Sequence, residues 1–300
     1  MSAVTEASPL ATTVLSSATK RSHVSVWSRF RRHKLALFGL AILVLLTFVS
    51  IAAPLLTEHG PYAVDLSAYR KPPGGSHPLG TDSAGRDVLA RLLYAGRVSL
   101  SVGVVAVSIY VAIGIVLGGL AGFFGGVVDA TVMRLADMVL SFPAIIVIIT
   151  LVSILGPNLM NVMLVIGLLG WPPISRLVRA EFLTLRERDF VVASRSVGAG
   201  SGRIIFRHVL PNAMTPVIVN ATFGMAQAIL LEAGLSFLGL GVQPPTASWG
   251  NMLNEAQSIT ILEGMPWLWI PPGVMIALAV LSINFVGDGL RDALDPRARR

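Results

Sequence analysis

Long uncharged apolar stretches alternate with shorter polar ones along the chain, and their lengths suit membrane crossings. About 20 apolar residues in a helix cross the roughly 30 Å hydrocarbon core of a bilayer. One stretch, Met138–Ser175, is too long for a single crossing, and Gly156-Pro157-Asn158 divides it in two. The pattern therefore predicts an all-α membrane protein with six transmembrane helices. The other four predicted spans are Leu35–Leu56, Val98–Val128, Ala213–Leu240 and Trp267–Gly287.

The second predicted span carries a glycine at every fourth position. Gly114, Gly118 and Gly122 therefore share one helix face, where small residues let two helices approach closely in lipid. Pro143 lies near the start of the third span and has no backbone N–H, so a kink is expected there. The glycine spacing predicts helix packing rather than a nucleotide-binding loop.

Polar segments lie on both sides of the second span. Residues 57–97 precede it, and a helix is expected to begin within Gly80–Leu92, with Asp82 or Ser83 as its cap. A short polar connection to the third span is expected after it, with three charged residues: Asp129, Arg134 and Asp137.

The basic residues predict how the spans are oriented, because Lys and Arg gather on the cytoplasmic side of a membrane. Most of the 23 Lys and Arg residues lie before the first span, after the last, or between the fourth and fifth. Both chain ends are therefore expected in the cytoplasm, and residues 57–97 outside it. The basic residues expected outside are Arg70, Lys71, Arg86, Arg91 and Arg97.

Composition agrees with a membrane protein and excludes several other classes. Apolar residues make up 54% of the chain and charged residues only 13%, too few to cover a surface facing water. The net charge of +7 does not indicate nucleic acid as a partner, because the basic residues lie at the ends of apolar stretches. The chain has no cysteine, so it forms no disulfide.

The largest polar stretch on the inner side is Glu181–Pro216, which is rich in arginine. Its apolar residues are spaced as on a helix, and Ser201 and Pro211 are expected to cap and end a second short helix. We expect a helix, a turn and a helix outside the bilayer. Three glycines interrupt the pattern and predict the turn: Gly198, Gly200 and Gly202.

This stretch resembles the EAA loop of the membrane subunits of binding-protein-dependent ABC importers. The resemblance rests on Ala193-Ser194, Gly198 and Leu210-Pro211, although Val192 stands where the family has glutamate. The run Arg207–Asn212 is similar to the branch that imports peptides. Two further segments resemble the C-type subunit of dipeptide, oligopeptide and nickel permeases: Gly80–Arg91 and Asp288–Pro296.

The resemblance implies the ABC type I importer permease fold and a subunit that forms half of a translocation path. It implies three kinds of partner: a second homologous permease subunit, two cytoplasmic ATPases that use ATP and Mg, and an external substrate-binding protein. The implied cargo is a dipeptide or oligopeptide, with nickel or another small solute as the alternative. Val192 and Ile204 are expected to be buried against an ATPase. The full set expected to couple to it is Asp189, Val192, Ala193, Ser194, Arg195, Gly198, Arg203 and Pro211.

Catalytic chemistry of its own is not expected in this chain. A phosphate-binding loop needs Lys-Ser or Lys-Thr after its glycines, and none of the three lysines has that context. The five histidines are scattered in the sequence, and we expect no metal, cofactor or catalytic site. A membrane-embedded enzyme is a less favoured alternative, because it would need clustered acids or an activated nucleophile on facing spans.

Three polar residues lie inside the fifth span and are expected along the substrate path: Asn220, Gln227 and Glu232. An acid within a membrane span usually has a function. The alternative for Glu232 is an ion pair at the interface with one of three arginines: Arg86, Arg91 or Arg97.

These boundaries divide the chain into four parts. Residues 1–33 form a partly disordered cytoplasmic tail, and residues 34–97 hold the first span and an extracytoplasmic segment. Residues 98–290 form the permease core with the EAA-like loop at 181–212, and residues 291–300 form a second cytoplasmic tail.

Overall fold

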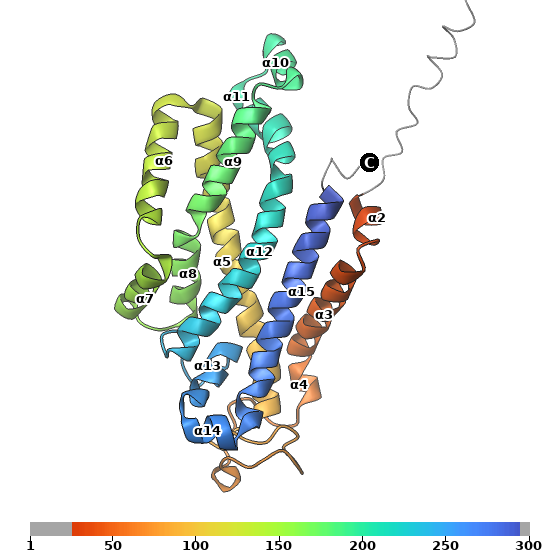
Figure 1. The fold of residues 1–300 in the computed structure, drawn as a ribbon, viewed down its shortest axis with the longest axis vertical. Helices are drawn as coiled ribbons and strands as arrows, with labels where there is room; N and C mark the ends of the chain where they lie inside the picture. The colour runs from red at the N-terminus through yellow and green to blue at the C-terminus, as the bar shows by residue number, and fades with distance from the viewer. Residues whose placement is uncertain (1–25, 295–300) are drawn as a thin grey trace, which may run out of the picture.

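The structure is a computed structural model, and it describes residues 26–294. In that range the chain is helical apart from turns, loops and two isolated β-bridges. Figure 1 shows an elongated bundle whose long helices run along one common axis. Most of the predicted tails 1–33 and 291–300, including the expected disorder, lies outside the described residues.

Helices of very different length build the bundle. Their bounds in chain order are α2 (Val26–Phe30), α3 (Lys34–Ile51), α4 (Ala53–Leu56), α5 (Val88–Phe124), α6 (Gly126–Leu140), α7 (Ala144–Leu155), α8 (Leu159–Leu169), α9 (Trp171–Leu185), α10 (Asp189–Ser196), α11 (Ser201–Ile204), α12 (Leu210–Phe237), α13 (Trp249–Leu253), α14 (Ile259–Gly264) and α15 (Ile270–Leu294). A π-helical turn, Ile205–Val209, joins α11 to α12.

The described residues hold up to six candidate membrane spans. Among the described residues, five helical segments are long and apolar enough to cross a membrane, and the bent pair α6–α7 adds a sixth when it is counted as one span. The pair bends by 82° at the break that holds Pro143, where the sequence predicts a kink. The prediction of six spans is confirmed. Figure 1 also places α2 and the end of α15 at the same end of the bundle as α10 and α11.

The second span begins earlier than its apolar pattern predicts. α5 starts at Val88, and the cap is Asp87, whose carboxylate accepts the backbone N–H of Ala90 at 2.7 Å. Neither Asp82 nor Ser83 caps it, so that prediction is wrong. Asp82 instead organises the turn before the helix, and Asp87 is the carboxylate that reaches the free N–H groups of the first helical turn.

The polar connection predicted after the second span is also helical. Asp129 and Asp137 both lie in α6, which begins directly after α5 at Gly126. Asp129 pairs with Arg179 of α9, and Asp137 pairs with Arg176 of the same helix. Because each acid has a basic partner on a neighbouring helix, charge at these positions is compatible with a continuous helix.

Two proline sites lie in the first turns of long helices. Trp171-Pro172-Pro173 opens α9, where a missing N–H costs nothing in the first turn. Pro211 lies in the first turn of α12, and 201–237 runs on as one helical segment. The π-helical turn before Pro211 widens the helix, so the proline ring and its missing N–H are accommodated. The prediction that Pro211 ends the second short helix is therefore wrong.

The glycine face of α5 forms a close seam with α9. A methyl group added to Gly114 would come within 2.6 Å of the Ile174 side chain. One added to Gly118 would overlap the backbone carbonyl of Ser175, and one at Gly122 would meet Arg179 O at 2.7 Å. The backbones thus lie too close for any side chain between them, as the four-residue spacing predicts.

The segment between α4 and α5 folds around a buried carboxylate at the other end of the bundle. Asp82 accepts the backbone N–H groups of Ala84 at 2.8 Å and Arg86 at 2.9 Å, and it pairs with the side chains of Arg86 and Arg91. On the surface of this segment, the Ser67 hydroxyl and backbone N–H bind Asp65 and hold the pKa of its carboxyl below the ordinary value. This compact segment precedes α5 and fixes where that helix begins.

Candidate coupling element and central cavity

The predicted turn between two short helices lies between α10 and α11. Gly198 has φ +82°, its N–H donates to Arg195 O, and the N–H of Ala199 donates to Ser194 O, both at 3.0 Å. This pair of hydrogen bonds is the Schellman motif, which ends a helix with a residue in the left-handed region. A side chain at Gly198 would meet nothing within 4 Å, so the backbone conformation alone requires glycine.

The second short helix begins slightly differently from the prediction. Gly200 is its N-cap and makes no side-chain hydrogen bond, while Ser201 is the first helical residue. Ser201 therefore does not cap the helix. We name residues 189–209, which comprise α10, α11 and the π-helical turn, the α10–α11 element. Figure 1 shows it projecting beyond the other helices at its end of the bundle.

The α10–α11 element exposes apolar side chains that its own fold does not cover. Val192 is 52% exposed, Val197 84% and Phe206 72%. Ile204 is only 2% exposed and packs in the main core with Val191, so it is not available to a partner as expected. Phe206 is not among the predicted coupling residues, because helical spacing does not reveal which face of so short a helix is covered.

The other predicted coupling residues take different places in the α10–α11 element. Asp189 is exposed in the first turn of α10, and Arg195 and Arg203 are exposed farther along the element. The hydroxyl of Ser194 donates to its own helix at Phe190 O, 2.7 Å away. Ala193 is exposed beside it, and Pro211 lies just beyond the element in α12. The element thus combines an exposed apolar surface with arginine charge.

A central cavity of about 340 Å³ is lined by the middle of α5 and α12 and by the ends of α7, α8 and α9. Asn220 and Gln227 of α12 lie in its wall, together with Tyr110 of α5. The Asn220 amide donates to Pro216 O at 3.2 Å, which satisfies part of its hydrogen-bonding capacity within its own helix. The remaining lining is mostly apolar: Ala144, Ile148, Ile166, Leu169, Gly170, Pro173, Ile174, Phe223, Gly224, Ala228 and Leu231.

Glu232 lies farther along α12 and is not among the residues that line this cavity. It is fully buried, accepts a hydrogen bond from the Ser236 hydroxyl at 2.7 Å, and has the Ser99 hydroxyl at 3.4 Å. Ser99 also accepts the backbone N–H of Trp249 at 3.1 Å. The carboxyl therefore joins α5, α12 and the start of α13.

The arginines proposed as alternative partners of Glu232 bind elsewhere. Arg86 and Arg91 pair with Asp82. The guanidinium of Arg97 donates hydrogen bonds to the carbonyls of Ser50 and Ile51 at 2.7 Å each. These bonds satisfy carbonyls that have no partner within the last turn of α3. The expected ion pair with Glu232 is therefore wrong, because serine hydroxyls occupy its carboxylate oxygens.

Comparison with known proteins places this architecture in a family. Residues 114–300 match the family described as the binding-protein-dependent transport system inner membrane component. That range covers more than half of the chain, including the α10–α11 element and most of the cavity wall. The chain belongs to this family. Residues 24–73 separately match the N-terminal transmembrane domain of oligopeptide transport permease C.

Named relatives of this inner membrane component align over nearly its whole length. A protein of Brucella suis biovar 1 (strain 1330), with the provisional name of a peptide permease protein, is 50% identical over 90% of each chain. The dipeptide transport system permease protein DppC of Alkalihalophilus pseudofirmus is 41% identical over 92% of this chain and 91% of that one. The oligopeptide transport system permease protein OppC of Bacillus subtilis (strain 168) is 37% identical over 93% and 92%.

A solved structure supports the fold of the inner membrane component. A chain of the MetNI methionine ABC transporter, in an inward-facing conformation, superposes with a TM-score of 0.54. The match covers 68% of this chain and 96% of that one at 20% sequence identity, so it supports the fold alone. The chain is thus a multi-pass inner membrane protein with the helical fold of an ABC importer permease.

Proposed function

We propose that this chain is the membrane-spanning permease subunit of an ATP-driven peptide importer. The observation that carries the proposal is the near full-length similarity to permeases named for dipeptides and oligopeptides, at 37–41% identity. None of the relatives described above is named for nickel, so peptide is the preferred cargo. The proposed partners are a second homologous permease subunit, two cytoplasmic ATPases that bind ATP and Mg, and an external substrate-binding protein.

The α10–α11 element is the proposed contact with an ATPase. An exposed apolar surface on a protein usually marks an interaction site, and Val192, Val197 and Phe206 supply one here. Arg195 and Arg203 would add pairing with acidic residues of the partner, which fixes orientation and speeds association. In this arrangement both chain ends and the element face the cytoplasm, and ATP hydrolysis belongs to the partner.

The central cavity is the proposed half of the substrate path. Its mostly apolar wall with a few amide groups suits peptide backbones and varied side chains, because ligand sites combine apolar lining with few polar contacts. Asn220 and Gln227 are the proposed contacts. For Glu232 the serine contacts favour a structural role in holding three helices together.

Reconstitution of the complete transporter in lipid vesicles tests this proposal. The two permease subunits, both ATPases and the binding protein should hydrolyse ATP faster when a dipeptide is added, and the vesicles should accumulate labelled dipeptide. The purified chain alone should hydrolyse no ATP. Nickel ions form the matched arm of the assay. Nickel uptake without dipeptide uptake would overturn the peptide assignment. ATP hydrolysis by the purified chain alone would overturn the proposal that the partner subunits hydrolyse ATP.

A further inference from the structure

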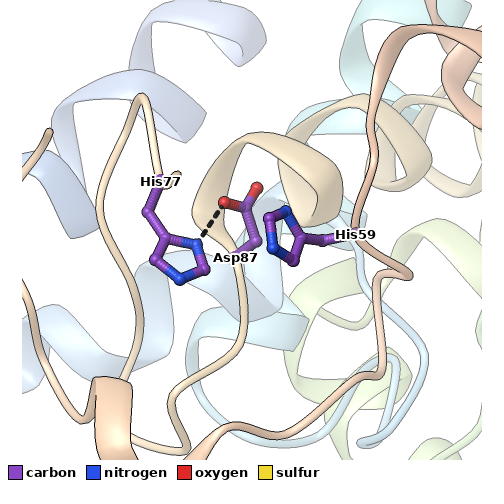
Figure 2. A group of neighbouring side chains, drawn as sticks. All are labelled: His59, His77 and Asp87. Carbon is purple, nitrogen blue, oxygen red and sulfur yellow. Dashed lines mark hydrogen bonds and ion pairs between the residues drawn. The ribbon is translucent and has the colours of Figure 1, made fainter. Parts of the chain in front are cut away.

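Three side chains that are far apart in the sequence meet beside the start of α5. Figure 2 shows the Asp87 carboxylate beside the imidazole rings of His59 and His77. Each residue offers one ligand atom, and these atoms all lie within 4.8 Å of one another. His77 Nδ1 and Asp87 Oδ2 are 2.8 Å apart, and the two imidazole rings are 4.8 Å apart between centroids.

The fold holds two of these groups firmly. Asp87 is 4% exposed, and its Oδ1 caps α5 through the backbone N–H of Ala90, which leaves Oδ2 toward the histidines. His77 is 8% exposed and lies in a tight hairpin, paired with Gly74 through two backbone hydrogen bonds of 3.0 Å. His59 is half-buried in the loop that follows α4. Separate stretches of chain thus converge on one point.

We propose that His59, His77 and Asp87 bind a divalent transition-metal ion of the Zn²⁺ class. Two imidazoles and one carboxylate are ligands that zinc prefers, whereas Mg²⁺ and Ca²⁺ prefer oxygen ligands alone. With bonds of about 2.0–2.1 Å, tetrahedral ligand atoms lie roughly 3.3 Å from one another. The ligand atoms now lie up to 4.8 Å apart, so a small movement of the His59 loop would bring all three within bonding distance of one ion.

Ion binding is compatible with the hydrogen bonds already present. The ion would occupy the position between His77 Nδ1 and Asp87 Oδ2, and the imidazole hydrogen would move from Nδ1 to Nε2. Asp87 Oδ1 would keep the cap of α5, because the two carboxylate oxygens point to different partners. The start of α5 is therefore preserved when the ion binds.

A route for the ion from solvent lies next to the cluster. A cavity of about 260 Å³ is lined by His59 and Asp87, and by the exposed carboxylate residue Glu58. Its volume is sufficient for several water molecules, which would supply the remaining ligands of an ion with three protein ligands. Glu58 adds negative charge at the rim and favours entry of a cation.

The consequence would be a cross-link between two spans at the end of the bundle opposite α10 and α11. His59 follows the first span, and Asp87 begins the second, so one ion would fasten both to the His77 hairpin. None of these residues lines the central cavity. The ion would therefore be structural rather than cargo, and its binding does not depend on which solute the transporter carries.

Metal binding by the full-length protein in detergent tests this inference. The protein carries no polyhistidine tag, is stripped with a chelator, and is titrated with Zn²⁺ by calorimetry. The bound metal is then counted by elemental analysis. We expect one Zn²⁺ per chain, and excess Mg²⁺ should not displace it. Less than a tenth of an equivalent of Zn²⁺ in the wild-type protein would overturn the proposal.

Variants assign the metal to the cluster. His59→Ala and Asp87→Asn should each weaken Zn²⁺ binding by about 10-fold or more, and Asn at position 87 still caps the helix. His208→Ala, which removes a half-buried histidine at the other end of the bundle, is the matched control and should bind normally. Zn²⁺ should also raise the melting temperature of the wild-type and His208→Ala proteins but not of His59→Ala. Unchanged stoichiometry and affinity in His59→Ala would contradict the site.

Discussion

Glycine serves two different purposes in the seam between α5 and α9 and in the turn between α10 and α11. In the seam, Gly118 lies against the backbone of Ser175, and any side chain would overlap it. In the turn, Gly198 is surrounded by open space, yet its φ of +82° excludes most other residues. The first glycine is required by a neighbour and the second by its own backbone.

This difference separates stability from partner binding. The seam joins two spans, so a substitution there changes the packing of the membrane core. The turn lies in a projecting element with an exposed apolar surface, so a substitution there changes the shape presented to a partner while the spans stay packed. Variants of the two glycines should therefore fail in different assays.

The largest effect is expected from Gly118→Leu. The overlapping atom is a backbone carbonyl, which cannot rotate away, so the destabilisation should reach about 3 kcal/mol, the upper end of overpacking costs. Yield of monodisperse protein and thermal unfolding measure it. Gly273→Leu is the control, because a side chain at that helical position meets nothing within 4 Å. Equal melting temperatures for the two variants would show that α5 and α9 are not close-packed.

An intermediate effect is expected from Gly198→Asp. The left-handed conformation costs a residue with a Cβ about 1–2 kcal/mol, so α10 should lose its Schellman ending while the spans remain folded. Binding to the ATPase, measured by co-purification, should fall sharply. Gly200→Asp adds the same charge in equally open space at φ −68°, so it should bind normally. Equal loss in both variants would mean that charge rather than backbone conformation is responsible.

A smaller effect is expected from Arg203→Glu. Reversing one exposed charge in the α10–α11 element should weaken ATPase association by about 10-fold, chiefly through slower association at low salt. The loss should shrink as salt is raised. Arg134→Glu makes the same change on the exposed side of α6 and is the control. If Arg203→Glu binds the ATPase as tightly as the wild-type protein at every salt concentration, the charge of Arg203 makes no contribution to the proposed contact.

The smallest effect is expected from Glu232→Gln. The serine hydroxyls can turn to satisfy an amide, so unfolding should change by about 1 kcal/mol or less and uptake should persist. Glu232→Leu, which leaves those hydroxyls without a partner, should cost more. Abolished dipeptide uptake in a stably folded Glu232→Gln protein would restore a direct role for Glu232 in the substrate path.

Much of the fold follows from the sequence, because apolar length, glycine spacing and proline position act locally. Six spans, the kink at Pro143 and the turn at Gly198 are all local features of this kind. The start of α5 was not predictable from apolar length, since Arg97 interrupts the pattern. Its guanidinium is satisfied by carbonyls of α3, a partner remote in sequence.

The sites depend more heavily on remote contacts, and sequence reasoning located fewer of them. Glu232 contacts Ser236 of its own helix and Ser99 of α5, and no local pattern in the sequence indicates that Ser99 is its neighbour. Which of Ile204 and Phe206 is exposed depends on how α11 packs on the core. The meeting of His59 and His77 likewise arises only from the folding of residues 57–87. The spacing of apolar residues in the sequence does not predict which distant residues meet in the fold.

The central claim is that the α10–α11 element meets an ATPase on the cytoplasmic side. The chain has no cysteine, so single cysteines at the exposed positions Ser201 and Ser76 report on its two ends without background. In intact cells, an impermeant thiol reagent should label position 76 and not 201. In the assembled transporter, a short cross-linker at 201 should join this chain to the ATPase, and one at 76 should not. Labelling of 201 from outside, or cross-linking to the ATPase only from 76, would contradict the account.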